Sequence, residues 1–132
     1  MTEWTLYDYV DVHGANQFKA WSECLQKREL AKLNAKLDML QQHGPSLPPR
    51  LLAGPIRGHG HIYKLEIRGQ VQLRPLLCKG PIRNDEEYSL LIGAIEQGWK
   101  LLPTGAAAEA ERRRQEITTS PQARRTLHER VL

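Results

Sequence analysis

A leucine repeat between residues 30 and 40 constrains the fold of this chain more than any other feature. The leucines recur at spacings of three and four with charged and polar residues between them, which predicts an amphipathic helix with one buried face. The run His43-Gly44-Pro45 predicts its end, because glycine accepts a left-handed cap and proline cannot continue a helix. Such a helix must pack on another layer. The repeat comprises Leu30, Leu33, Leu37 and Leu40.

Strand patterns lie on both sides of this helix. Alternating residues predict strands over 4–12, 61–68 and 71–78, although Pro75 indicates an edge or a bulge in the last of these. An apolar run within 88–102 predicts one more strand, placed centrally in the sheet. The sequence therefore predicts a sheet able to cover the leucine face.

Further helices complete the expected order. Asn16 can cap a helix that carries Phe18 and Trp21 on one face, and a short joint to the leucine helix predicts an antiparallel helical hairpin. Residues 106–117 and 122–132 read as C-terminal helices. The expectation is an α+β domain with a mostly antiparallel sheet, an N-terminal helical hairpin packed on one face, and C-terminal helices.

Size and composition favour one domain in a reducing compartment. The chain has 132 residues, and its two cysteines, Cys24 and Cys78, form no disulfide framework and are both expected to be buried. Neither a signal peptide nor an apolar run of the roughly 20 residues that a membrane span needs is apparent. We expect a cytoplasmic protein with no membrane partner.

Positive charge is concentrated in residues 45–83. This segment holds seven basic residues and one acid, Glu66, a net charge of +6 within a chain of net charge +4. Because the clearest strands lie in the same segment, we expect a basic sheet face, which indicates a polyanion and first of all nucleic acid. The basic residues are Arg50, Arg57, Lys64, Arg68, Arg74, Lys79 and Arg83.

Four stretches, in this order, resemble the RelE/HigB-like toxins of type II toxin–antitoxin systems, in particular the phage-derived HigB-like branch. The stretch YDYVDVHGANQFKAWSECL looks like the opening strand and first helix, and ELAKLNAKLDMLQQHGPSL looks like the second helix. LEIR and QLRPLL look like the paired strands, and SLLIGAIEQGWKLLPTGAAAEAERRRQ like the last strand and closing helix. The resemblance gives a RelE-like toxin domain over residues 1–117 and a helical extension over 118–132.

The resemblance implies a ribosome-dependent messenger RNA endoribonuclease that needs no metal or cofactor. In such a reaction the ribose 2′-hydroxyl loses its proton and attacks the neighbouring phosphate, so a base and phosphate-binding cations are required. Arginine suits the phosphate because its planar fork matches two oxygens. By motif, Arg68 and Arg74 are the catalytic candidates, on adjacent strands where they can converge. The implied partners are the ribosome, messenger RNA and a helix-turn-helix antitoxin.

Other residues extend this candidate site. His61 begins the strand that bears Arg68 and is a candidate acid–base group, while Lys100 is the one lysine left in a turn that is lysine-rich in the family. His59 and His61 have a chelating spacing, but two ligands do not make a metal site. Each candidate has a structural alternative, such as a solvated strand arginine or a packed tryptophan. The remaining RNA-binding candidates are Arg57, Lys64, Lys79, Arg83 and Trp99.

Two residues depart from the family pattern and leave other functions open. Glu96 brings negative charge to the lysine-poor turn, and Pro75 interrupts a paired strand. A non-catalytic or degenerate RelE/ParE-fold binding protein, such as a gyrase-type inhibitor or a phage or mobile-element protein, is therefore the alternative. A plain nucleic-acid-binding domain ranks third because no stacking platform is evident. An apolar stripe through Leu127, Val131 and Leu132 leaves homo-oligomerisation open.

Overall fold

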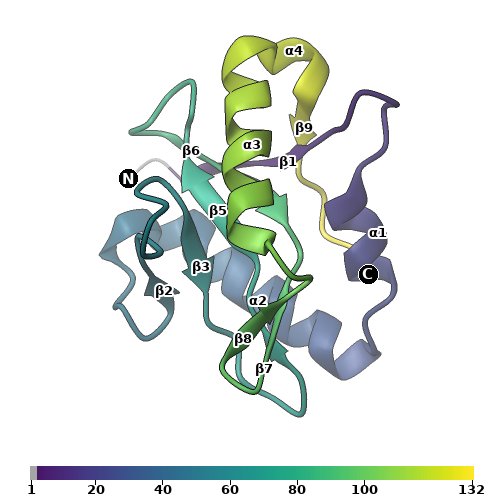
Figure 1. Cartoon of the computed structure of the whole chain (residues 1–132). Coiled ribbons are helices and arrows are strands. Elements are labelled where there is room, and N and C mark those ends of the chain that lie inside the picture. Colours follow the sequence, from purple (N-terminus) through teal and green to yellow (C-terminus); the bar gives the residue numbers. More distant parts are fainter. Residues whose placement is uncertain (1–2) are drawn as a thin grey trace.

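The computed structural model describes residues 3–132 and has an α+β architecture with helices on both faces of a mixed sheet. Helix α3 (Ala106–Thr119) covers the front of the sheet in Figure 1, and α2 (Lys27–His43) lies behind it. The shorter helices are α1 (Gln17–Glu23), the 3-10 turn η1 (Gly44–Ser46) and α4 (Pro121–Arg124).

The main sheet has six strands and is mixed rather than uniformly antiparallel. In their order across the sheet, the strands are β2 (Leu52–Ala53), β3 (Tyr63–Leu65), β5 (Leu76–Lys79), β6 (Glu87–Ile92), β1 (Thr5–Tyr9) and β9 (Arg125–Leu127). Strand β1 runs parallel to β6, and the other neighbouring pairs are antiparallel. Every residue of β6 is buried, which confirms the central strand that its apolar run predicts.

A second, smaller sheet extends from the lower end of the molecule in Figure 1. It consists of β4 (Gln72–Leu73), β7 (Ile95–Gln97) and β8 (Lys100–Leu102), in that order and all antiparallel. The register pairs Gln72 with Glu96 and Leu73 with Ile95. The turn between β7 and β8 therefore lies beside the loop that precedes β4.

Two apolar cores hold the layers together. The leucine repeat of α2 is confirmed as the source of the first core, where Leu33, Leu37 and Leu40 are fully buried against the sheet. The second core lies under α3, whose small residues Ala106 and Ala110 allow the helix to approach the strands closely. The helix ends where predicted, because Gly44 has a φ of +52° and a Cβ there would lie 2.4 Å from Trp4 Nε1.

The expected helical hairpin is not seen. Both helices are present, but α1 is only seven residues long and packs against β1 and β6 rather than along α2. Its buried residues, Phe18 and Ser22, face inward, and Asn16 caps its first turn by accepting a hydrogen bond from the Lys19 amide. A helix of about two turns can bury one aromatic side chain on the strands but offers little surface to a second helix.

The prediction of a helix over 122–132 is wrong. Helix α4 ends at Arg124, and residues 125–127 form β9, which adds an antiparallel edge strand to β1. Pairing with β1 outweighs the weak helical pattern of this short segment. Residues 130 and 131, which follow β9, contact α2: the Asn34 side chain donates a hydrogen bond to the carbonyl of Val131, and Arg130 forms an ion pair with Asp38.

Two predicted strands are each broken in the middle. Pro75 separates β4 from β5, as its missing amide proton leads one to expect. Gly93 and Ala94 separate β6 from β7, and a Cβ on Gly93 would lie 2.0 Å from Cδ2 of the Trp21 ring. The ring of Trp21 therefore occupies the space beside the chain where it changes sheets. Within residues 3–132, no helix is both long and apolar enough to cross a bilayer.

Candidate functional site

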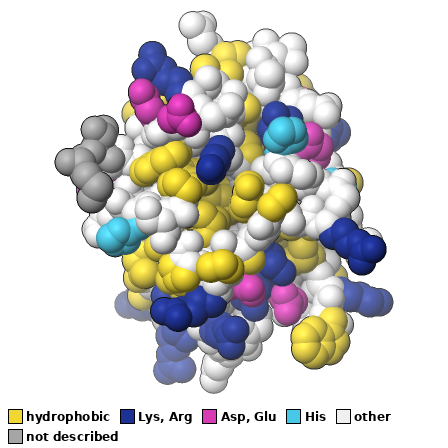
Figure 2. Space-filling view, turned by 90° about the vertical axis from the view of Figure 1, so that its left-hand side faces the viewer, with side chains coloured by type: hydrophobic (Ala, Val, Ile, Leu, Met, Phe, Trp, Pro, Cys, Tyr) yellow, Lys and Arg dark blue, Asp and Glu magenta, His cyan; other side chains and the backbone are white. Residues whose placement is uncertain are grey.

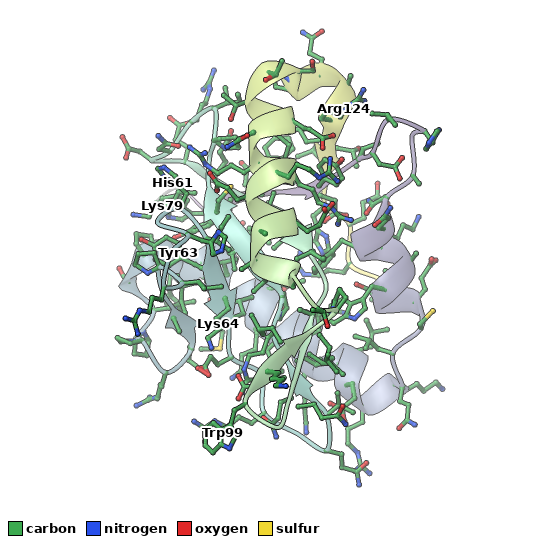
Figure 3. All side chains as sticks on the ribbon, viewed as in Figure 1. His61, Tyr63, Lys64, Lys79, Trp99 and Arg124 are labelled. Carbon is green, nitrogen blue, oxygen red and sulfur yellow. The ribbon has the colours of Figure 1, made fainter. Side chains whose placement is uncertain are left out.

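One pocket gathers polar and cationic side chains from several elements, and we call it the His61 pocket. It has a volume of about 200 Å³. Strand register explains why His61 and Lys79 lie together. Strand β3 pairs Tyr63 with Leu77, so two residues further along this antiparallel pair His61 lies opposite Lys79. Figure 3 shows His61, Lys79 and Tyr63 close together along one edge of the molecule. The lining residues are Gly60, His61, Tyr63, Lys79, Asn84 and Arg114.

The turn between β5 and β6 and helix α3 supply the other two functional side chains. Gly80 has a φ of +66°, and a Cβ there would lie 2.2 Å from Asn84 Oδ1, so the tight turn holds Asn84 at the pocket rim. Arg114 reaches the pocket from α3, with its Nη1 3.3 Å from Glu111 Oε1. By contrast, neither His61 nor Lys79 belongs to an ion pair of residues 3–132, and both are exposed. Their side chains are therefore available to a ligand.

An apolar hollow adjoins the His61 pocket and shares Tyr63 and Lys79 with it. This hollow has a volume of about 270 Å³. Its floor includes Tyr88, whose buried hydroxyl has no hydrogen-bond partner within residues 3–132. Burial, and then the nearby Tyr63, raise the pKa of Tyr88 to about 12. The remaining walls are Pro45, Leu47, Pro49 and Leu52. Figure 2 shows hydrophobic side chains surrounding a cationic one near the middle of this face.

The two arginines singled out from the sequence do not converge. Arg74 is 5% exposed, and its Nε lies 3.3 Å from Glu96 Oε1 and 3.5 Å from Glu66 Oε1. Its Nη1 also donates to the carbonyl of Leu73 at 2.9 Å. Arg68 instead is exposed and faces α2. The difference is one of burial and partners: Arg74 is held inside the protein by Glu66 and Glu96, whereas Arg68 lies on the surface in a hollow that Glu66 also lines.

The other predicted RNA-binding residues are spread over the molecule. Lys64 lies 3.8 Å from Glu96 and is partly neutralised by it. Arg57 is exposed in the loop before β3, and Arg83 is exposed and pairs with Glu86. Neither of these two lines the His61 pocket. Lys100 is also remote from it, because it begins β8 beside the exposed Trp99 at the lower end in Figure 3.

A second cationic hollow lies between α2 and the end of β3, and we call it the basic groove. It has a volume of about 400 Å³ and an apolar floor that includes Leu51 and Ile67. Figure 2 shows Lys and Arg side chains gathered at the lower edge of this face. The cations that line the groove are Lys32, Lys36, Arg50 and Arg68.

Sequence reasoning missed Arg114, Asn84 and the lysines of α2. Arg114 belongs to a run of three arginines that reads as a salt-bridged helix face, and Arg112 and Arg113 do pair with Glu109. Only the packing of α3 on the sheet shows that the third arginine reaches a pocket.

The two cysteines differ from one another: Cys78 is buried as expected, whereas Cys24 is exposed. Among the described residues, His59 and His61 have no third partner that could complete a metal site.

No protein-family model matches the chain, and neither a curated protein nor a solved structure is significantly similar to it.

Proposed function

We propose that this chain is a RelE-like toxin of a type II toxin–antitoxin system, and that it cleaves ribosome-bound messenger RNA without a metal ion. The observation that carries the proposal is the His61 pocket, in which an imidazole, a phenol and two cations from separate elements line one solvent-open hollow. A chain order of one strand, two helices, antiparallel strands and a closing helix supports the RelE-like assignment.

The groups of the pocket match the needs of 2′-hydroxyl attack on phosphorus. The His61 imidazole takes the proton of the 2′-hydroxyl, because histidine is the side chain best suited to act as a general base near neutral pH. The Lys79 ammonium and the Arg114 guanidinium stabilise the negative charge that develops on the phosphoryl oxygens. Tyr63 donates its phenolic proton toward the leaving 5′-oxygen. The nucleophile belongs to the substrate, so no metal is needed to generate it.

The apolar hollow beside the pocket supplies a place for a nucleobase. It shares Tyr63 and Lys79 with the His61 pocket, so a base held against the proline and leucine walls lies next to the cations that hold its phosphate. Single-stranded RNA is bound in this way, with splayed bases on apolar or aromatic surfaces and phosphates on cations. The ribosome would present such a strand, and a helix-turn-helix antitoxin would keep the pocket closed until it is removed.

Specific ion pairs favour the second candidate, a non-catalytic binding protein on the same scaffold. Glu66 and Glu96 neutralise Arg74, and Glu96 also approaches Lys64, so two cations that the sequence assigns to RNA are compensated within the chain. A gyrase-type inhibitor or a degenerate toxin would need no phosphate clamp. This candidate predicts that the cations of the His61 pocket are dispensable for any toxicity.

Induction of the chain in a bacterium tests the proposal. We expect growth arrest with cleaved messenger RNA, and we expect the double variant His61→Ala/Lys79→Ala to relieve both effects. General-base and cation contributions of about 10²-fold or more each make the double variant close to inactive. A matched control is His43→Ala, which removes an exposed histidine at the end of α2.

The outcomes separate the two candidates. Growth arrest with intact messenger RNA would favour the gyrase-type protein, and no arrest from folded, soluble chain would favour a degenerate one. Arrest that persists in the double variant while messenger RNA is still cut would remove the His61 pocket from the reaction.

A further inference from the structure

The basic groove and the turn between β7 and β8 lie at the same end of the molecule, away from the His61 pocket. The register that pairs Gln72 with Glu96 places the loop over residues 68–71 beside the turn over 97–100. Arg68 begins that loop and lines the groove, and the Gln72 side chain fixes the loop by donating to the carbonyl of Gly69 at 2.9 Å. Arg68, which lines the groove, therefore begins the loop that lies beside the turn containing Trp99.

None of the four cations of the groove forms a direct ion pair within residues 3–132, and this holds for Lys32, Lys36, Arg50 and Arg68 alike. Glu66, the one acid in the lining, is held by Arg74. The buried carboxylate of Glu29 lies near Lys32 at Gly69, which leaves Lys36, Arg50 and Arg68 as the cations that favour an anionic ligand with several charges.

Trp99 is presented to solvent in an unusual way. It is 96% exposed, whereas Trp4 and Trp21 are partly buried against the first core. Gly98 and Trp99 both have positive φ, 57° and 68°, so they form the two central residues of a tight hairpin turn in which a tryptophan is strained. A large aromatic ring that is 96% exposed and sits on a backbone conformation costly for tryptophan indicates an external partner. Lys100 follows directly.

We propose that this end of the molecule is a second RNA-binding site, in which the basic groove holds the phosphates of a single strand and Trp99 stacks on one of its bases. A positively charged groove combined with an exposed aromatic ring is the usual arrangement for single-stranded nucleic acid. An acidic peptide would also satisfy the cations, but it would leave the exposed indole without a function. The site does not depend on cleavage at the His61 pocket.

Binding of a fluorescent 2′-O-methyl oligoribonucleotide to the full chain tests this site. The probe lacks the free 2′-hydroxyl, so cleavage cannot confuse the measurement, and His61→Ala should bind it as the parent chain does. We expect Lys36→Gln/Arg68→Gln to weaken binding about tenfold at low salt and to reduce the salt slope by about 1.4, since each phosphate contact on a single strand contributes about 0.7.

A charge-matched variant and the tryptophan variants complete the test. Lys19→Gln/Lys27→Gln also removes two positive charges, from exposed positions outside the groove, and should change affinity less than about twofold. Trp99→Ala should weaken binding about tenfold and Trp99→Phe much less, because a phenyl ring still stacks. Equal losses in the two charge variants, or unchanged binding by Trp99→Ala, would overturn the proposal. Displacement of the probe by polyglutamate as readily as by unlabelled oligonucleotide would overturn it too, and would assign the surface to an acidic peptide.

Discussion

Arg74 illustrates how one residue can look catalytic in the sequence and have a structural position in the fold. Its guanidinium bridges Glu66 and Glu96 and donates to backbone carbonyls, so it joins the end of the main sheet to the smaller sheet. Loss of activity in an Arg74 variant would therefore not identify a phosphate contact. His61 and Lys79, which are exposed and unpaired within residues 3–132, give an interpretable result.

Replacing Arg74 should destabilise the protein. Arg74→Met leaves two carboxylates without their shared partner, and we expect the free energy of unfolding to fall by about 2–3 kcal/mol in urea titrations. Arg68→Met is the matched control, because Arg68 is exposed and its loss should cost within about 0.5 kcal/mol. Equal effects of the two substitutions would show that the buried ion pairs contribute nothing to stability.

The sequence does not reveal which of the three tryptophans is exposed. Trp4, Trp21 and Trp99 all lie near apolar residues, and nothing local marks Trp99 as the exposed one. The signal is the tight turn at Gly98, which becomes visible only once β7 and β8 pair. The same holds for Arg114, whose role depends on how α3 lies on the sheet.

Among the elements, α2 could be predicted and β9 could not. The leucine spacing and the glycine that ends the helix are local signals, so α2 follows from the sequence alone. Strand β9 forms because β1 offers an unpaired edge, which is a property of the assembled sheet. The β6–β7 break at Gly93 has the same origin, since the approach of the Trp21 ring is a tertiary contact.

A buried pair fastens β9 to the rest of the molecule. His128 Nδ1 lies 2.8 Å from Asp8 Oδ1, and both side chains are almost fully buried. Asn16 donates to the other Asp8 oxygen at 2.8 Å, so the same carboxylate ties β9 to the start of α1. The C-terminal strand is therefore part of the fold rather than an appendage to it.

His128→Ala should loosen this strand. Removing the imidazole leaves the buried Asp8 with one partner, and we expect a loss of about 2–3 kcal/mol together with faster amide hydrogen exchange in β9. Leu127→Ala is the control on the same strand, because Leu127 is 60% exposed and should cost less than about 0.5 kcal/mol. Unchanged exchange in the His128 variant would mean that backbone pairing alone holds the strand.

At the scale of the whole molecule, both cores contain thiol or phenol groups whose pKa values are raised, so that they are harder to ionise than usual. Burial raises the pKa of Cys78 from 9.0 to about 12. Burial, followed by the hydrogen bond to Glu116, raises the pKa of Tyr9 to about 12, the same value that Tyr88 reaches. The folded chain therefore keeps these groups protonated where the unfolded chain releases their protons.

Stability should consequently fall at alkaline pH. These three groups contribute their full stabilisation below about pH 9, and it is lost as the pH rises toward about 12, because only the unfolded chain ionises over that interval. We expect the urea midpoint to decline steadily across this window, with part of the tyrosinate absorbance appearing only near its upper end. A midpoint that stays constant up to about pH 12 would contradict the burial of these side chains.

The most direct test of the central claim is the chemistry of the RNA ends made by the purified chain on ribosome-bound messenger RNA in the presence of a chelator. Attack by the 2′-hydroxyl predicts 2′,3′-cyclic phosphate ends that form without added metal, and that are absent with His61→Ala/Lys79→Ala but present with His43→Ala. Intact messenger RNA from folded chain, or ends with a free 3′-hydroxyl, would contradict the assignment of the His61 pocket as a metal-independent ribonuclease site.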